Sequence, residues 1–148
     1  MKIYTIGYEG IDIDRFMKCM EFFNVSKLID VREVTQSRRK DFSKNALANL
    51  LMEHGIDYIS IKELGTPKKL RDKLRKTRNY ESFFKEYRDY LKDKNHLLVE
   101  ILQLIHDNHT VALMCYEKDH NKCHRKIIAE EIQKIDNNGL KISQMLVK

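Results

Sequence analysis

The chain of 148 residues carries 28 lysines and arginines against 22 aspartates and glutamates, a formal net charge of +6, and 42% of its residues are hydrophobic. This length and composition predict one globular domain over residues 1–148 and argue against a collagen-like, disordered or two-domain chain. The uninterrupted apolar runs are far shorter than the roughly 20 residues of a membrane-spanning helix. No secretory leader follows Met1, so we expect a cytoplasmic protein without a membrane partner.

The three cysteines are Cys19, Cys115 and Cys123. An odd number of cysteines in a chain of this size predicts reduced thiols rather than a framework of disulfides. The basic excess favours anionic partners, either nucleic acid or anionic small molecules, although +6 over 148 residues is a mild bias.

Predicted strands and helices alternate in the first part of the chain. β-branched and apolar runs bounded by turn residues predict strands, and apolar residues at helical spacing after a capping side chain predict helices. In chain order these elements are a strand at 2–8, a helix at 13–23 capped by Asp12 or Asp14, a strand at 28–31, a helix between its cap Ser43 and its stop signal Gly55, and a strand at 57–61.

The middle of the chain departs from this alternation. Residues 62–78 contain eight basic and two acidic residues, a run more typical of a solvated face than of a nucleic-acid-binding surface. The elements predicted after it are, in chain order, an amphipathic helix at 80–91, a second helix or its continuation at 97–105, an apolar strand at 110–115, a polar loop at 116–122, a helix at 127–135 ended by 137–139, and a tail at 140–148 available as an edge strand.

This pattern predicts an α/β fold, in which a single domain holds a small, mostly parallel sheet of four to five strands flanked by helices. Polar residues that a core does not require follow the predicted strands. They are Tyr8, Asp30, Arg32, Cys115 and Glu117, with the turn Leu64–Gly65 after the third strand. Because the carboxyl ends of parallel strands share one edge, where ligands bind, we expect these segments to converge on one surface.

The densest group of such residues is the segment Cys115–Arg125. Its second half opens a predicted helix, whose free N–H groups and the cationic side chains of Lys122, His124 and Arg125 form a cradle for an oxyanion. Arg32 adds a guanidinium from the neighbouring strand end, suited to bidentate contact with phosphate or carboxylate. These residues predict a site for a phosphate-like or carboxylate group.

Two side chains of this segment are candidates for chemistry. A positive environment favours the thiolate of Cys115 and raises its reactivity, and Glu117 is the natural acid or base beside it. The competing interpretation is that Cys115 is the buried last residue of a strand, as free cysteines often are. Asp30 either orients Arg32 or caps a turn.

A metal ion is a competing chemistry at the same place. The segment offers nitrogen, sulfur and oxygen donors suited to zinc, namely Cys115, Glu117, Asp119, His120, Cys123 and His124. The spacing matches no known zinc pattern, however, and adjacent Cys123 and His124 on a helix would point about 100° apart. We therefore predict no resident cofactor and no metal ligand.

Several short motifs together resemble the family called domain of unknown function 488 (DUF488). In chain order they are Thr5-Ile6-Gly7-Tyr8, Asp30-Val31-Arg32, Ser37 with Phe42-Ser43, Gly55-Ile56 with Tyr58, Leu64-Gly65, Cys115-x-Glu117 and Cys123-His124-Arg125. The resemblance implies a small prokaryotic α/β domain, and the family's name implies no established activity. It supports a site at these motifs.

A weaker similarity is to rhodaneses and the phosphatases built like them, which pair an Asp-Val-Arg-like strand end with a cysteine loop. Their loop closes on an arginine that, counted from Cys115, falls at position 121, where this chain has Asn121. The characteristic cradle is therefore absent, and sulfur transfer is an analogy of fold alone.

The sequence thus predicts an anion-binding, catalytic pocket at the carboxyl edge of the sheet, in a hydrolase or transferase acting on an anionic substrate. The predicted catalytic residues are Cys115, Glu117 and His124. The predicted substrate-binding residues are Tyr8, Asp30, Arg32, Ser37, Cys123 and Arg125. The alternatives are a non-catalytic nucleic-acid-binding module that uses residues 62–78, rhodanese-like sulfur transfer, a metal-dependent hydrolase, and a purely structural Cys-His-Arg cluster.

Overall fold

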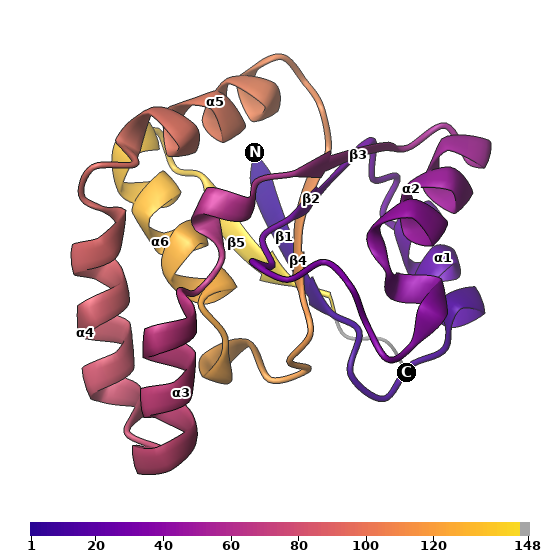
Figure 1. Ribbon diagram of the computed structural model, residues 1–148. Coiled ribbons are helices and arrows are strands. Elements are labelled where there is room, and N and C mark those ends of the chain that lie inside the picture. Colours follow the sequence, from indigo (N-terminus) through magenta and orange to yellow (C-terminus); the bar gives the residue numbers. More distant parts are fainter. Residues whose placement is uncertain (146–148) are drawn as a thin grey trace.

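The computed structural model describes residues 1–145 as one five-stranded sheet with helices on both faces (Figure 1). In chain order the strands are β1 (Lys2–Gly7), β2 (Lys27–Asp30), β3 (Asp57–Ser60), β4 (Val111–Cys115) and β5 (Lys141–Gln144). They lie side by side in the order β3-β2-β4-β1-β5, and each neighbouring pair is parallel. The predicted α/β class with a small parallel sheet is confirmed.

Helices cover both faces of this sheet. Those on the first face are α1 (Ile13–Phe22) and α2 (Lys44–Glu53), and those on the second are α5 (Asn95–His106) and α6 (Arg125–Asp136) (Figure 1). Outside α6 lies α4 (Tyr80–Leu91), and α3 (Lys68–Thr77) packs against α4. Short 3-10 helices occupy three loops, η1 (Lys40–Phe42), η2 (Lys62–Leu64) and η3 (His120–Lys122).

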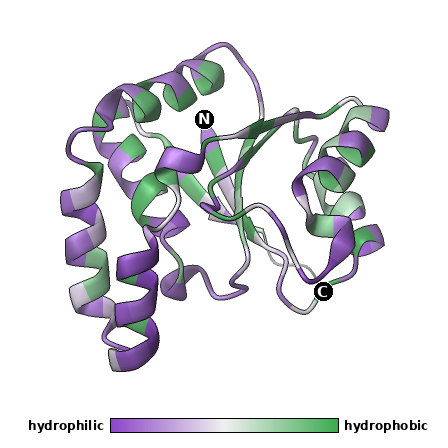
Figure 2. Cartoon of the chain, viewed as in Figure 1, coloured by the Kyte–Doolittle hydropathy of each residue, from purple (hydrophilic) through white to green (hydrophobic). Residues whose placement is uncertain are grey.

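The position of β4 at the centre of the sheet explains why its sequence is apolar throughout. Val111, Leu113 and Cys115 join the hydrophobic cluster under α5 and α6. Ala112 and Met114 join the cluster under α1 and α2. Successive side chains of a strand point to opposite faces, so a strand covered on both faces needs apolar residues at every position. Figure 2 shows this apolar centre between more hydrophilic outer helices.

Two of the helix-end residues predicted from the sequence, Asp12 and Gly55, act as predicted, and a third, Ser43, does not. Asp12 caps α1, because its Oδ1 accepts a hydrogen bond from the backbone N–H of Arg15 at 2.8 Å. Gly55 ends α2 with φ of +73°, in the left-handed region that glycine adopts without strain. Ser43 stands at the N-terminus of α2 but makes no capping hydrogen bond. Its hydroxyl instead bonds the backbone N–H and carbonyl of Ser37, so this cap prediction is wrong and Ser43 fixes a loop.

Helix α3 is an element that the sequence does not predict. It lies within the basic run 62–78 and has no fully buried side chain, and its apolar face is narrow, with only Leu70 and Leu74, both half-buried, among basic residues. It is attached to α4 partly through an ion pair of 2.8 Å between Lys73 and Glu86. The helices α4 and α5 are separate, because the chain leaves the helical conformation between Leu91 and Asn95.

The C-terminal tail forms the predicted edge strand in part. Lys2 of β1 is in register with Lys141 of β5, and the pairing continues to Thr5 and Gln144. The end of the predicted tail, 146–148, lies outside the described residues. Within residues 1–145, no helix combines the length and the apolar character needed to cross a bilayer.

The start of β5 is held by the carboxylate of Asp136 at the end of α6. It accepts hydrogen bonds from the backbone N–H groups of Asn138 at 2.9 Å and Leu140 at 3.1 Å, and it lies 2.8 Å from Nε2 of His106. The hydrogen bond with His106, followed by those from the backbone, lowers the pKa of Asp136 below its usual value. This carboxylate therefore ties together α5, α6 and β5.

We predict that Asp136→Asn lowers the free energy of unfolding near pH 7. A lowered pKa means that the folded state favours the ionised carboxylate, so its stabilisation is present above the ordinary aspartate pKa of about 4 and is lost as the pH falls through the lower folded-state pKa. Urea unfolding should show a difference between wild type and variant that shrinks towards pH 3. Asp89→Asn, at an exposed pair with Lys92, is the control, and an equal effect of both substitutions would contradict the prediction.

Candidate functional site

A cavity of about 440 Å³ lies at the carboxyl edge of the sheet, between the ends of β1, β2 and β4 and the helices α3 and α4. Six of the nine residues predicted for the site line it, and these are Tyr8, Arg32, Cys115, Glu117, Cys123 and His124. The other three, Asp30, Ser37 and Arg125, are not among the lining residues, and each contacts one that is. The strand ends therefore converge as the parallel order requires.

Arg32 is locked against Asp30 at the end of β2. Its Nε and Nη2 donate to the two carboxylate oxygens of Asp30 at 2.9 and 2.7 Å, and its Nη1 donates to the hydroxyl of Tyr8 at 3.0 Å. Tyr58 also donates its hydroxyl to Asp30. Burial acts to lower the pKa of Arg32, but the hydrogen bond and charge of Asp30 raise it above its usual value. Arg32 thus remains charged, with most of its donors already used.

Ser37 supports the same network from the loop after β2. Its hydroxyl accepts a hydrogen bond from Tyr8 at 3.5 Å and from the backbone N–H of Arg39 at 3.1 Å. The guanidinium of Arg39 in turn donates to the backbone carbonyl of Tyr8 at 2.9 Å. The ring of Tyr8 stacks on Phe42, with centroids 4.4 Å apart. Ser37 therefore positions Tyr8, which lines the cavity.

Arg125 is fully buried at the first turn of α6. Its guanidinium donates to Sγ of Cys115 at 2.9 Å, to the backbone carbonyl of Glu117, and to the backbone carbonyl of Lys118 at 3.2 Å. Burial lowers the pKa of Arg125 to about 10, so it is still charged at neutral pH. Its donors point at the loop that follows β4, and Arg125 therefore shapes this loop.

Gly7 allows that loop to approach β1. A Cβ atom at this position would lie 1.8 Å from the carbonyl oxygen of Glu117, the same oxygen that accepts from Arg125. Only a residue without a side chain fits at this distance, which gives a steric reason for the glycine after the first strand.

Cys115 and Cys123 are joined by a disulfide, whereas the sequence predicts reduced thiols. The loop after β4 folds back so that the residue before His124 returns to the strand end. Cys123 has φ of −135° and ψ of 145°, an extended conformation, and α6 begins only at Arg125. The expectation that Cys123 and His124 point apart on a helix is therefore wrong, because Cys123 precedes the helix.

His124 is buried and neutral at the wall of the cavity. Its Nε2–H donates to the backbone carbonyl of Val31 at 2.6 Å, which leaves Nδ1 as the lone-pair nitrogen, 3.6 Å from Sγ of Cys123. Burial lowers the pKa of His124 to about 4. It therefore adds no positive charge at neutral pH, in contrast to the cationic donor that the sequence suggests.

Glu117 is an acidic side chain at the wall of the cavity. It lines the cavity, and no hydrogen bond from another side chain to its carboxylate is found within residues 1–145. Burial raises the pKa of Glu117 above its usual value, against the opposing effects of its own backbone N–H and the charge of Arg125. This environment suits a group that exchanges a proton with a ligand.

The structure adds a set of cationic residues that the sequence reasoning missed. Arg71, Arg75 and Arg78 line the cavity from α3 and the residue just after it. Arg71 is paired with Glu33 at 2.9 Å, but the side chains of Arg75 and Arg78 have no hydrogen bond or ion pair within residues 1–145. Arg71 and Arg75 are four residues apart on one face of α3, a signal visible in the sequence once a helix is assumed, and Arg78 follows the helix in a left-handed conformation.

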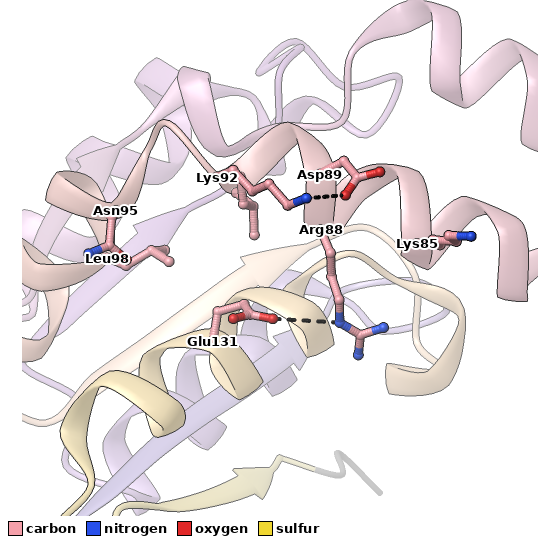
Figure 3. Close-up of a pocket in the computed structure, with 8 residues that line it drawn as sticks. Lys85, Arg88, Asp89, Lys92, Asn95, Leu98 and Glu131 are labelled. Carbon is pink, nitrogen blue, oxygen red and sulfur yellow. Dashed lines mark ion pairs between the residues drawn. The ribbon is translucent and has the colours of Figure 1, made fainter.

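A second cavity, between α4, α5 and α6, lacks these features. Its lining includes Arg88, Asp89, Lys92 and Glu131 (Figure 3). Lys92 pairs with Asp89 at 2.9 Å, and Arg88 lies 3.6 Å from Glu131. These four charges are matched by one another, and Lys85, which also lines this cavity, has no ion pair within residues 1–145. Because none of the residues predicted for the site lines this second cavity, we take the cavity at the carboxyl edge of the sheet as the candidate functional site.

Residues 12–132 match the family described as Domain of unknown function DUF488. The match includes most of the 148 residues and three of the strand ends that border the cavity or lie beside it. The chain belongs to this family. No curated protein and no solved structure matches it. The description of the DUF488 family names no activity.

We predict that Arg125→Met destabilises this DUF488 domain. The apolar side chain keeps much of the buried volume but leaves the carbonyl of Glu117 without its donor, at a cost of about 1–3 kcal/mol. It also removes one of the two donors to the carbonyl of Lys118, which Gln144 bonds as well at 3.3 Å. Arg15→Met, at an exposed position of α1, removes the same charge and is the control. Chemical denaturation should give a clearly lower free energy of unfolding for Arg125→Met only, and equal stability of the two variants would overturn the role given to Arg125.

Proposed function

We propose that this protein binds an anionic ligand, with a phosphate or carboxylate group, in the cavity at the carboxyl edge of its sheet. The observation that carries the proposal is the set of unpaired cations around the cavity. Arg75, Arg78 and Lys122 line it, and none of their side chains has a hydrogen bond or ion pair within residues 1–145. Guanidinium groups with free donors are the residues of choice for phosphate and carboxylate.

The balance of charge around the cavity supports an anion. Five basic side chains line it, Arg32, Arg71, Arg75, Arg78 and Lys122, against the acidic pair Glu33 and Glu117. Arg32 and Arg71 are neutralised by Asp30 and Glu33, so the excess resides on the unpaired residues. A cleft lined by one sign of charge raises the local concentration of ligands of the opposite sign.

The chemistry that we propose beside this anion centres on Glu117. Its carboxyl lines the same cavity as the arginines and lies among the buried groups at the end of β4. Cys115 and His124 line that wall too, but the sulfur of Cys115 is engaged in the disulfide and Nε2 of His124 is engaged by Val31. Glu117 is therefore the group available to exchange a proton with a bound hydrolase or transferase substrate.

A nucleic-acid-binding module is the second candidate, and the exposed face of α3 favours it. Lys69 and Lys76 are exposed on this helix and do not line the cavity. If α3 tracked a phosphate backbone, these lysines would contribute as much as the arginines, and the affinity would fall steeply with salt. A small anion in the cavity would require the arginines specifically.

We predict that the double variant Arg75→Gln with Arg78→Gln weakens the binding of pyrophosphate at least about a hundredfold, as expected from the loss of two charge-assisted contacts of about 1.5–3 kcal/mol each. The measurement is isothermal titration calorimetry at two salt concentrations, with pyrophosphate as the probe. The matched control is Lys69→Gln with Lys76→Gln, which changes the net charge equally on the same helix but outside the cavity.

The two candidate functions give opposite results in this comparison. If only the arginine double variant loses affinity for pyrophosphate, the result supports binding of the anion in the cavity. An equal loss in both double variants, with a steep dependence on salt and binding to duplex DNA or RNA, would replace the proposal with the nucleic-acid module. Absence of measurable binding for phosphate, pyrophosphate, a nucleoside monophosphate and a dicarboxylate by the folded wild type would overturn it.

A further inference from the structure

Three metal-ligating side chains meet at the end of β4. The sulfurs of Cys115 and Cys123 and a ring nitrogen of His124 all lie within 4.8 Å of one another, and all three residues are buried. This is the one such group of histidine, cysteine and carboxylate ligands within residues 1–145. Thiolate and imidazole are the ligands that favour zinc over magnesium, calcium or manganese.

The histidine is oriented as a metal ligand. Its Nε2–H is held by the backbone carbonyl of Val31 at 2.6 Å, so the lone pair of Nδ1 faces Sγ of Cys123 at 3.6 Å. Zinc-binding histidines characteristically donate their second ring N–H to a carbonyl or carboxylate, which fixes both the tautomer and the orientation of the ring. His124 has this arrangement before any metal is present.

Both sulfurs also receive N–H donors from one residue. The guanidinium of Arg125 donates to Sγ of Cys115 at 2.9 Å, and the backbone N–H of Arg125 donates to Sγ of Cys123 at 3.5 Å. Hydrogen bonds to sulfur favour the thiolate over the thiol, and thiolate is the form that binds a metal. The buried arginine therefore supports the charge state that a zinc site needs.

The group leaves one coordination position open. Cys115, Cys123 and His124 supply three ligands, and all three line the cavity that holds the unpaired arginines. Structural zinc sites are usually closed by four protein ligands, whereas catalytic sites keep the fourth position for water or substrate. A site of this kind would face the cavity.

We propose that the reduced protein binds one zinc ion through Sγ of Cys115, Sγ of Cys123 and Nδ1 of His124, with the fourth position open to the cavity. A dithiol first exchanges with the disulfide, so that the bond between the sulfurs breaks, the dithiol becomes a disulfide, and two electrons and two protons pass to Cys115 and Cys123. Zinc then replaces the two protons and forms two Zn–S bonds. The oxidised and the metal-bound forms exclude each other.

The test is a cobalt titration of the reduced protein. The chain is reduced with dithiothreitol, freed of reductant without oxygen and titrated with Co²⁺, whose thiolate charge-transfer and tetrahedral ligand-field absorptions report the ligands directly. We expect one Co²⁺ for each chain, displaced by one Zn²⁺, and no binding before reduction. Cys123→Ser should abolish the charge-transfer band.

The control is Cys19→Ser, which removes the free cysteine buried on α1. In this variant a thiolate band can come only from Cys115 and Cys123, so it should keep the wild-type spectrum and stoichiometry, and this decides the question even if Cys123→Ser does not fold. Absence of cobalt binding by the folded, reduced Cys19→Ser protein would overturn the proposal, as would an unchanged spectrum in Cys123→Ser. The pyrophosphate titration uses the metal-free protein, so the two proposals stand or fall separately.

Discussion

The buried guanidinium of Arg125 is the interaction on which the rest of the site depends. A charge without exposure to solvent is costly unless its donors are satisfied, and here Nη1 and Nη2 donate to the sulfur of Cys115 and to the backbone carbonyls of Glu117 and Lys118. Nε is buried and has no hydrogen-bond partner within residues 1–145. The same contacts fold the loop after β4 back onto the strand end. Because that loop carries Glu117, and because it returns Cys123 to Cys115, the shape of the cavity wall follows from one side chain.

The basic residues of this protein therefore have two physical roles. Arg125 and Arg32 are buried and paired, and they build the wall of the cavity by satisfying oxygens and sulfur of the chain itself. Arg75 and Arg78 are exposed, and their side chains have no hydrogen bond or ion pair with residues 1–145, which leaves their donors for a ligand. The net charge of +6 therefore matters less for function than the position of a few cations, those that α3 and the residue after it present to the cavity. The three side chains proposed to bind zinc, Cys115, Cys123 and His124, belong with the buried residues of the wall.

Much of the fold could be predicted from the sequence because its signals are local. The apolar β4 run and the alternation of strands with helices fix a parallel sheet, and the parallel order then places Tyr8, Arg32 and Cys115 at one edge. Helix α3 escaped prediction because its side chains are not buried. The partners of Arg125 and the meeting of Cys115 with Cys123 depend on how a polar loop returns to the sheet, and no spacing rule specifies that path. The meeting of these side chains at one edge of the sheet was therefore predictable, and their pairings were not.

We attribute the binding of an oxyanion to Arg75 and Arg78, the cavity arginines that have no partner within residues 1–145. The most direct test is a crystal structure of the protein soaked with tungstate, a tetrahedral oxyanion whose anomalous scattering identifies it without ambiguity. We expect an anomalous peak in the cavity, within hydrogen-bonding distance of the guanidinium groups of Arg75 and Arg78. Peaks confined to the outer surface of α3, beside Lys69 or Lys76, with none in the cavity, would contradict it.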